Sequence, residues 1–359
     1  MNVTAPSSPR RTRAFVLVLV LVFSAVTLAS LNVGPAGSLG ALELGRGLLG
    51  VLGFDGDVDE RLRGIVALRA KRTLVGIGVG AALAYSGALL QGVFRNDLAS
   101  PAVLGVTSGA SLGAAIAILG AGGYGPVAAF VGGTGSSLIV SLSAFAGAAS
   151  VLALVTAVGT RAGSVSVPTL LLAGVAVNAV VGGMLAALQA FALRDFEIAR
   201  ALFAWAFGQI EDRGAHEITA LYVALFASAA CLPFVARELD LFVAGEHDAR
   251  SLGVDAARVK WLALGAAGLS AGVAVSVVGQ IAFVGLVVPH LLRLAVGRSH
   301  RILLPLSLLG GATFLVGCDL VQRLFLEELH LHTGVWMSLI GGPLFLVLLV
   351  RDRRSLEYA

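Results

Sequence analysis

Ten apolar segments restrict the folds open to this chain more than any other feature of its sequence. They lie near residues 14–33, 74–93, 103–120, 137–158, 168–193, 216–236, 259–278, 280–297, 302–324 and 334–350. A bilayer core of about 30 Å is crossed by about 20 helical residues, and backbone polar groups inside lipid must be hydrogen-bonded within the protein. With 57% hydrophobic and 13% charged residues, the chain lacks the polar surface of a soluble protein. The sequence therefore predicts an all-α, polytopic membrane helical bundle with about ten transmembrane helices, formed as a single domain over residues 1–359.

Arginines at both ends of the chain predict that both termini are cytoplasmic. They are Arg10, Arg11 and Arg13 in the tail 1–13, and Arg351, Arg353 and Arg354 after the last apolar segment. Positively charged flanks stay in the cytoplasm, and an even number of spans returns the chain there. A cleaved signal peptide is the alternative for the first segment, but the apolar run 14–33 is longer than a typical signal core. We therefore expect a retained first span.

Glycine is frequent within the apolar segments. The chain has 46 glycines, and Gly76, Gly80, Gly105, Gly109 and Gly113 follow the i, i+4 spacing that lets helices approach closely in lipid. The stretch 126–158 is too long for one straight helix. We expect Gly132, Gly133 and Gly135 to mark a loop or re-entrant turn before the fourth span.

The segment between the first two spans departs from the charge rule. It should be external, yet it carries Arg46, Arg61, Arg63, Arg69, Lys71 and Arg72. Five acids partly offset these cations, so a solvated loop of mixed charge is one interpretation. The other is that Arg69 and Arg72, at the start of the second span, meet an acidic partner.

A series of motifs in order from about Arg69 to Arg351 narrows the function. They are Arg69-Ala-Lys-Arg-Thr73, Gly80 to Gln91, Arg95-Asn-Asp-Leu-Ala99 with Pro101, Leu170 to Gly174 with Asn178, Gly245-Glu246 with Ala249 to Val254, Phe283 to His290, Asp319 with Arg323, and Ile340-Gly-Gly-Pro343. This series resembles the FecCD family of ABC importer permeases, which import ferric siderophores, haem and cobalamin.

The resemblance implies a type II ABC importer permease fold in the bacterial cytoplasmic (inner) membrane. It also implies three kinds of protein partner: two copies of an ABC ATPase subunit, a periplasmic or lipid-anchored substrate-binding protein, and a second copy of this chain. A heterodimer with a related permease stays open as the alternative to a homodimer. We expect no catalytic residue, no metal site, no cofactor and no nucleic-acid partner.

The resemblance further implies that Arg69, Arg72 and Arg323 dock the binding protein through its glutamates. Arginine suits this role because its planar fork binds a carboxylate in two places. Lys71 stands where the family motif has proline, so the start of that helix is less constrained, and the extra cation is expected to tighten or broaden the contact. For Arg323 the alternative is snorkelling at a helix end.

The polar segment 237–260 lies between two apolar segments and is predicted to be cytoplasmic. It is similar to the coupling helices that family members dock on the ATPase, and the implied contact residues are Gly245, Glu246, Ala249, Arg250, Leu252 and Gly253. We expect turns at the glycines and an i, i+4 pair between Glu246 and Arg250. An amphipathic interfacial helix without a partner is the alternative.

Five polar or helix-distorting positions fall inside apolar segments, with roles in the pathway or in structure. They are Gln91, Asn178, Pro289, His290 and Asp319. An embedded acid is expensive in lipid, and pairing with Arg323 at i, i+4 would explain Asp319. His290 is interpreted as a hydrogen-bonded histidine at a kink, with haem ligation as the alternative.

Two histidines, His330 and His332, replace the Glu and Pro of the family pattern before the last span. They are interpreted as part of a solvated loop, with contact to iron or haem as the alternative.

The chain has no P-loop, because Lys71 precedes Arg72 and Lys260 precedes Trp261 instead of Ser or Thr. ATP must then be hydrolysed by another subunit. The rival function is a self-contained secondary transporter or channel, which needs ion-coupling residues near the bilayer midplane.

Overall fold

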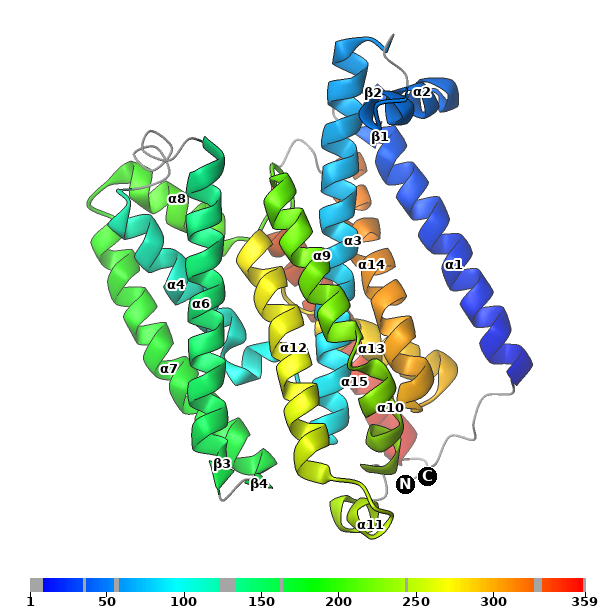
Figure 1. Cartoon of the computed structure of the whole chain (residues 1–359), viewed down its shortest axis with the longest axis vertical. Coiled ribbons are helices and arrows are strands. Elements are labelled where there is room, and N and C mark those ends of the chain that lie inside the picture. Colours follow the sequence, from blue (N-terminus) through cyan, green and yellow to red (C-terminus); the bar gives the residue numbers. More distant parts are fainter. Residues whose placement is uncertain are drawn as a thin grey trace.

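The computed structural model describes residues 9–34, 37–54, 58–122, 133–161, 164–242, 245–325 and 331–357, and these are helical apart from turns and two short hairpins (Figure 1). In the first hairpin, β1 (Val33–Gly34) pairs antiparallel with β2 (Gly37–Ser38). In the second, β3 (Thr160–Arg161) pairs antiparallel with β4 (Ser164–Val165).

Six helices in the described ranges are long and apolar enough to cross a membrane. They are α1 (Pro9–Asn32), α3 (Glu60–Phe94), α6 (Gly133–Gly159), α7 (Val167–Ala192), α12 (Ala256–Val278) and α14 (His300–Phe325). A seventh candidate span is the pair α9 (Ala215–Ala229) and α10 (Leu232–Phe242), bent by 52°. Three further helices are apolar but shorter or partly polar: α4 (Val106–Gly120), α13 (Val284–Val296) and α15 (Thr333–Glu357). The remaining elements are α2 (Ala41–Val51), η1 (Pro101–Leu104), α8 (Phe196–Ala206) and α11 (Glu246–Ser251).

The predicted helical bundle is confirmed, since each of the ten apolar segments overlaps one of these helices or the bent pair. In two of the apolar segments, 103–120 and 280–297, the helix is shorter than the predicted span. The helices α4 and α13 have 15 and 13 residues, and at about 1.5 Å per residue neither reaches across a bilayer core. A left-handed residue precedes each of them, Gly105 at φ 80° and Phe283 at φ 66°, so the helix cannot extend backwards.

A solvated loop, one of the two interpretations of the segment between the first two spans, is not what most of its described residues form. The chain forms α2 there, and α3 begins at Glu60 and runs for 35 residues. Residues 65–75 contain neither glycine nor proline, so nothing in the sequence stops the helix at the edge of the apolar segment. The cations from Arg61 to Arg72 therefore lie on the first turns of α3.

Two of the three glycines expected to mark a loop before the fourth span are helical. Gly132 lies outside the described residues, whereas Gly133 and Gly135 belong to the first turn of α6.

The central helix α3 packs against α12, α13 and α14, and glycines set the spacing. A Cβ atom at Gly80 would lie 2.2 Å from the carbonyl oxygen of Gly311, and one at Gly87 would lie 1.9 Å from that of Gly285. Such distances leave no room for a methyl group. The predicted close packing through small residues is confirmed at Gly80.

Replacing Gly87 by Ala is therefore expected to lower the free energy of unfolding by about 1–3 kcal/mol, because α3 and α13 must move apart. Thermal unfolding in detergent measures this effect. The matched control is Gly265→Ala in α12, where a Cβ meets nothing within 4 Å. If both variants unfolded at the wild-type temperature, the close approach of α3 and α13 would be wrong.

The bundle has two distinct ends. The β1–β2 hairpin, α2 and the start of α3 lie at one end, at the top of Figure 1, and α11 lies at the other with the β3–β4 hairpin. We call these the α2 end and the α11 end. The first residues of α1 point toward the α11 end.

Candidate functional site

A buried carboxylate organises the cations at the α2 end. Asp319 on α14 accepts hydrogen bonds from Arg72 Nε at 3.1 Å and Arg72 Nη2 at 2.7 Å, and it pairs with Arg323 Nη2 at 3.0 Å. Its side chain is only 2% exposed. The predicted i, i+4 pair with Arg323 is confirmed. The pair with Arg72, which is 247 residues away in sequence, was not anticipated.

The guanidinium group of Arg69 points back into the protein. It donates to the carbonyl oxygens of Asn32 and of Gly37, the latter at 2.6 Å, and Arg69 is buried. These acceptors lie at the C-terminal end of α1 and in the adjoining hairpin. A cation there is favourable because the last carbonyls of a helix lack partners within it.

Arg323 links the same end of α1 to α14 through hydrogen bonds. Its Nη1 donates to the carbonyl oxygens of Ser30 at 3.0 Å and Val33 at 2.9 Å, and its Nη2 donates to the Ser30 hydroxyl. Arg323 is buried as well. Two of the three arginines that the sequence pointed to are thus engaged in holding α1 to α3 and α14.

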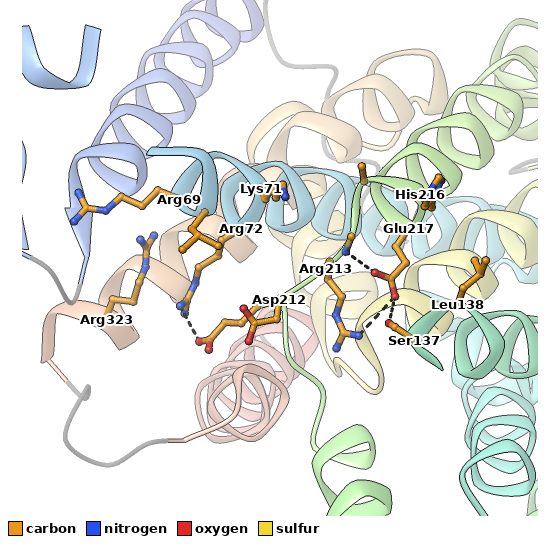
Figure 2. A pocket seen from close by; sticks show the side chains of 14 residues that line it. Arg69, Lys71, Arg72, Ser137, Leu138, Asp212, Arg213, His216, Glu217 and Arg323 are labelled. Carbon is orange, nitrogen blue, oxygen red and sulfur yellow. Dashed lines mark hydrogen bonds and ion pairs between the residues drawn. The ribbon is translucent and has the colours of Figure 1, made fainter. Parts of the chain in front are cut away.

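All three arginines line a cavity at the α2 end, but Arg72 differs from the other two because one of its nitrogens pairs there with a half-exposed acid. Its Nη1 pairs at 2.7 Å with Glu211, whose side chain is 49% exposed. The cavity has a volume of about 610 Å³, and Lys71, Arg213 and Glu217 also line it (Figure 2). No sequence pattern pointed to Glu211, which lies in the connection between α8 and α9.

The far wall of this cavity is fixed by Glu217. Its carboxylate accepts hydrogen bonds from the Gly214 amide at 2.6 Å and from the Ser137 hydroxyl (Figure 2). It also accepts one from the Ser141 hydroxyl at 3.2 Å. Arg213 lies 4.0 Å away. A carboxylate in the first turn satisfies unpaired amides of α9, and these bonds also join α9 to α6.

At the α11 end, the predicted cytoplasmic segment 237–260 is not one helix. The helix α10 ends at Phe242, α11 covers only Glu246–Ser251, and α12 begins at Ala256. Gly245 at φ 132° and Gly253 at φ 85° supply the breaks, as the sequence predicted.

The short helix α11 presents a mixed surface. Arg250 and Leu252 are exposed, whereas Ala249 is buried against the bundle. The predicted pair between Glu246 and Arg250 is present at 2.8 Å.

A buried lysine ties α11 to the bundle. Lys260 Nζ donates to Glu246 Oε2 at 2.6 Å and to the carbonyl oxygen of Val165 at 2.9 Å. Its side chain is 5% exposed. One ammonium group therefore joins α11, the start of α12 and the β3–β4 hairpin that leads into α7. The sequence alone gives Lys260 no such role, and it entered the argument there only because Trp261 follows it and excludes a P-loop.

The Glu246 carboxyl should keep this link ionised at neutral and mildly acidic pH. Burial alone would raise its pKa, but the hydrogen bond from Lys260 and the charges of Lys260 and Arg250 hold the pKa below its ordinary value. A carboxyl with a depressed pKa stabilises the fold above its unfolded pKa of about 4.3, and this contribution is lost as pH falls through the folded pKa.

We therefore expect the difference in unfolding temperature between wild type and Glu246→Gln to stay constant from about pH 8 to about pH 5 and to shrink at lower pH. Thermal unfolding of both proteins across this range measures it. A difference that vanished between about pH 8 and about pH 6 would contradict the Lys260 link.

Two of the embedded polar residues join neighbouring elements. Gln91 Nε2 donates to the carbonyl oxygen of Gly285 at 3.1 Å, and Asn178 Nδ2 donates to that of Ala102 at 3.0 Å. Such bonds agree with the structural alternative for both residues. Pro289 lies inside α13, and His290 beside it is buried.

Of the two histidines before the last span, only His332 lies within the described residues. His330 lies outside the described residues. The ring of His332 lies 5.6 Å from that of Phe207 between their centres, and its side chain is partly buried.

Comparison with known proteins gives consistent matches over most of the chain. Residues 16–351 match the FecCD transport family. The cobalamin import system permease protein BtuC of Halobacterium salinarum is 42% identical over 286 residues, which cover 80% of this chain and 73% of that protein. The hemin transport system permease protein HmuU of Yersinia pestis is 34% identical over 344 residues, which cover 94% of this chain and 97% of that protein.

A solved structure has the same fold. It is described as an inward-facing conformation of a metal-chelate type ABC transporter, with a TM-score of 0.79 and 29% identity over 94% of this chain and 99% of that one. The helical bundle, the ordered motifs and the extent of these matches agree. The chain belongs to the FecCD transport family, and it is a membrane-spanning permease subunit of an ABC importer.

Proposed function

We propose that this permease moves a metal chelate of the cobalamin, haem or ferric-siderophore class across the bacterial cytoplasmic membrane. Two copies of an ATPase subunit bind at the α11 end and hydrolyse ATP, and a substrate-binding protein delivers the ligand at the α2 end. The names of the relatives support cobalamin and haem as the first ligands to test.

The observation that carries this proposal is the helix α11. It is too short to be stable alone, and it is held against the bundle by Lys260 through Glu246 and the Val165 carbonyl. A tethered helix with exposed polar residues suits a contact that must pass motion from a soluble partner to membrane helices. In this proposal Gly245, Glu246, Ala249, Arg250, Leu252 and Gly253 form the coupling surface.

The docking site for the binding protein lies at the α2 end, and the three arginines have unequal roles there. Arg72 contacts the partner directly, because it alone of the three faces the cavity with a nitrogen held by an exposed acid. Arg69 and Arg323 are docking residues that also fix α1 and so shape the surface around Arg72.

The orientation follows from the partners. The α11 end faces the cytoplasm, where ATP is, and the first residues of α1 lie toward that end, in agreement with the arginines of the N-terminal tail. The C-terminus is assigned to the same side, and a second copy of the chain completes the translocation path. Gln91, Asn178, Pro289, His290 and Asp319 line or support this path.

A self-contained secondary transporter fits the geometry less well. It would need an embedded acid able to take up and release an ion. Asp319, the acid that the sequence places inside a span, is bound by two arginines.

Reconstitution of the permease in nanodiscs tests the proposed partners. The ATPase subunit from the same genome should bind the permease tightly enough to copurify, and ATP hydrolysis should rise when a binding protein loaded with cobalamin or haemin is added. If the ATPase failed to bind the intact permease, the assignment of the α11 end would be wrong.

A further inference from the structure

The three guanidinium nitrogens of Arg72 bind two carboxylates that differ greatly in solvent exposure. Nε and Nη2 bind Asp319, which is 2% exposed, and Nη1 binds Glu211, which is 49% exposed. Arg72 itself lies between the buried ion-pair cluster and the cavity.

The two carboxylates differ in how much free energy it costs to replace each of them on Arg72 by another carboxylate. Removing Asp319 from the arginines would leave charges buried without a counter-ion, which is strongly unfavourable. Separating Glu211 from Arg72 leaves Arg72 paired with Asp319 and releases Glu211, whose side chain is 49% exposed, into water, so it costs far less. The bond between Arg72 Nη1 and Glu211 is therefore the one that another carboxylate can replace.

The cavity beside this bond can receive such a group. Its volume of about 610 Å³ far exceeds that of a carboxylate, and Lys71 and Arg213 add positive charge to its lining (Figure 2). Lys71 is exposed. An acidic side chain that enters from outside would meet cations on more than one side.

We propose that Glu211 is a resident carboxylate that occupies Arg72 Nη1 until an acidic side chain of the binding protein replaces it. This inference rests on the proposed function, because it assumes that the binding protein docks at the α2 end. Competition from Glu211 weakens docking, since the partner must first displace it. The same competition speeds release, because Glu211 can return to Arg72 as the partner leaves.

Affinity measurements on the assembled permease–ATPase complex in nanodiscs test this role. The probe is the binding protein from the same genome that stimulates ATP hydrolysis by the wild-type complex. Glu211→Gln is expected to tighten its binding by roughly two- to fivefold, the range of an exposed ion pair. The matched control is Asp212→Asn, which removes an equal charge from the neighbouring position in the same cavity. It should change the affinity by less than about twofold.

A double-mutant cycle separates displacement from a general charge effect. In the Arg72→Gln background, Glu211→Gln should no longer tighten binding. An unchanged or weakened affinity of Glu211→Gln, or an equal gain in Asp212→Asn, would overturn the proposal while leaving the docking site intact. If no binding protein stimulated or bound the wild-type complex, the docking assignment itself would fail, and the role of Glu211 with it.

Discussion

Replacing Asp319 by Ala is expected to lower the free energy of unfolding by about 3–5 kcal/mol, because Arg72 and Arg323 would lose their shared buried counter-ion. Both arginines are held within 3.0 Å of this carboxylate. Arg323 also fastens the end of α1. The loss should therefore loosen the contact between α1 and α14 as well. Unfolding in detergent with increasing SDS or temperature measures this effect.

The matched control is Glu211→Ala, which removes the exposed carboxylate on the same arginine. It should lower the free energy of unfolding by about 1 kcal/mol or less, because exposed ion pairs contribute little. Equal losses in the two variants would mean that burial does not distinguish the two carboxylates. The assignment of Asp319 as the centre of the cluster would then be wrong.

Replacing Lys260 by Met is expected to uncouple ATP hydrolysis from transport. Hydrogen bonds to charged groups contribute about 1.5–3 kcal/mol each, so loss of the link could lower the uptake rate by roughly ten- to a hundredfold. The ATPase should still bind, because the exposed side chains of α11 remain. Uptake and ATP hydrolysis measured on the same reconstituted complex separate these effects.

The chain provides its own control, since Lys71 is the only other lysine. Lys71→Met removes an exposed cation at the α2 end and should leave the ratio of uptake to ATP hydrolysis unchanged. Thermal unfolding of both variants checks that they fold. An unchanged ratio in a folded Lys260→Met complex would show that the buried lysine carries no coupling.

Features set by local sequence were predictable. The ten apolar segments gave the helices, because lipid requires long apolar stretches whose backbone bonds are internal. The pairs of Asp319 with Arg323 and of Glu246 with Arg250 followed from i, i+4 spacing on one helix face.

Features set by contacts distant in sequence were not predictable from one chain. Arg72 lies 247 residues from Asp319, and Lys260 lies 95 residues from Val165. Neither pairing leaves a periodic signal. The start of α3 at Glu60 was not predictable either, because the apolar segment begins only near residue 74. The charged turns of α3 are stable because Arg69 donates to the Asn32 carbonyl at the end of α1 and Arg72 pairs with Asp319 on α14.

The most direct test of the account is ligand uptake by proteoliposomes that contain the permease, with and without its ATPase subunit. Cobalamin and haemin, each delivered by its binding protein, are the ligands to use. The account predicts uptake only when the ATPase, internal ATP and the binding protein are all present, with no effect of a proton gradient alone. Uptake driven by a proton gradient in vesicles that contain the permease but no ATPase would contradict it.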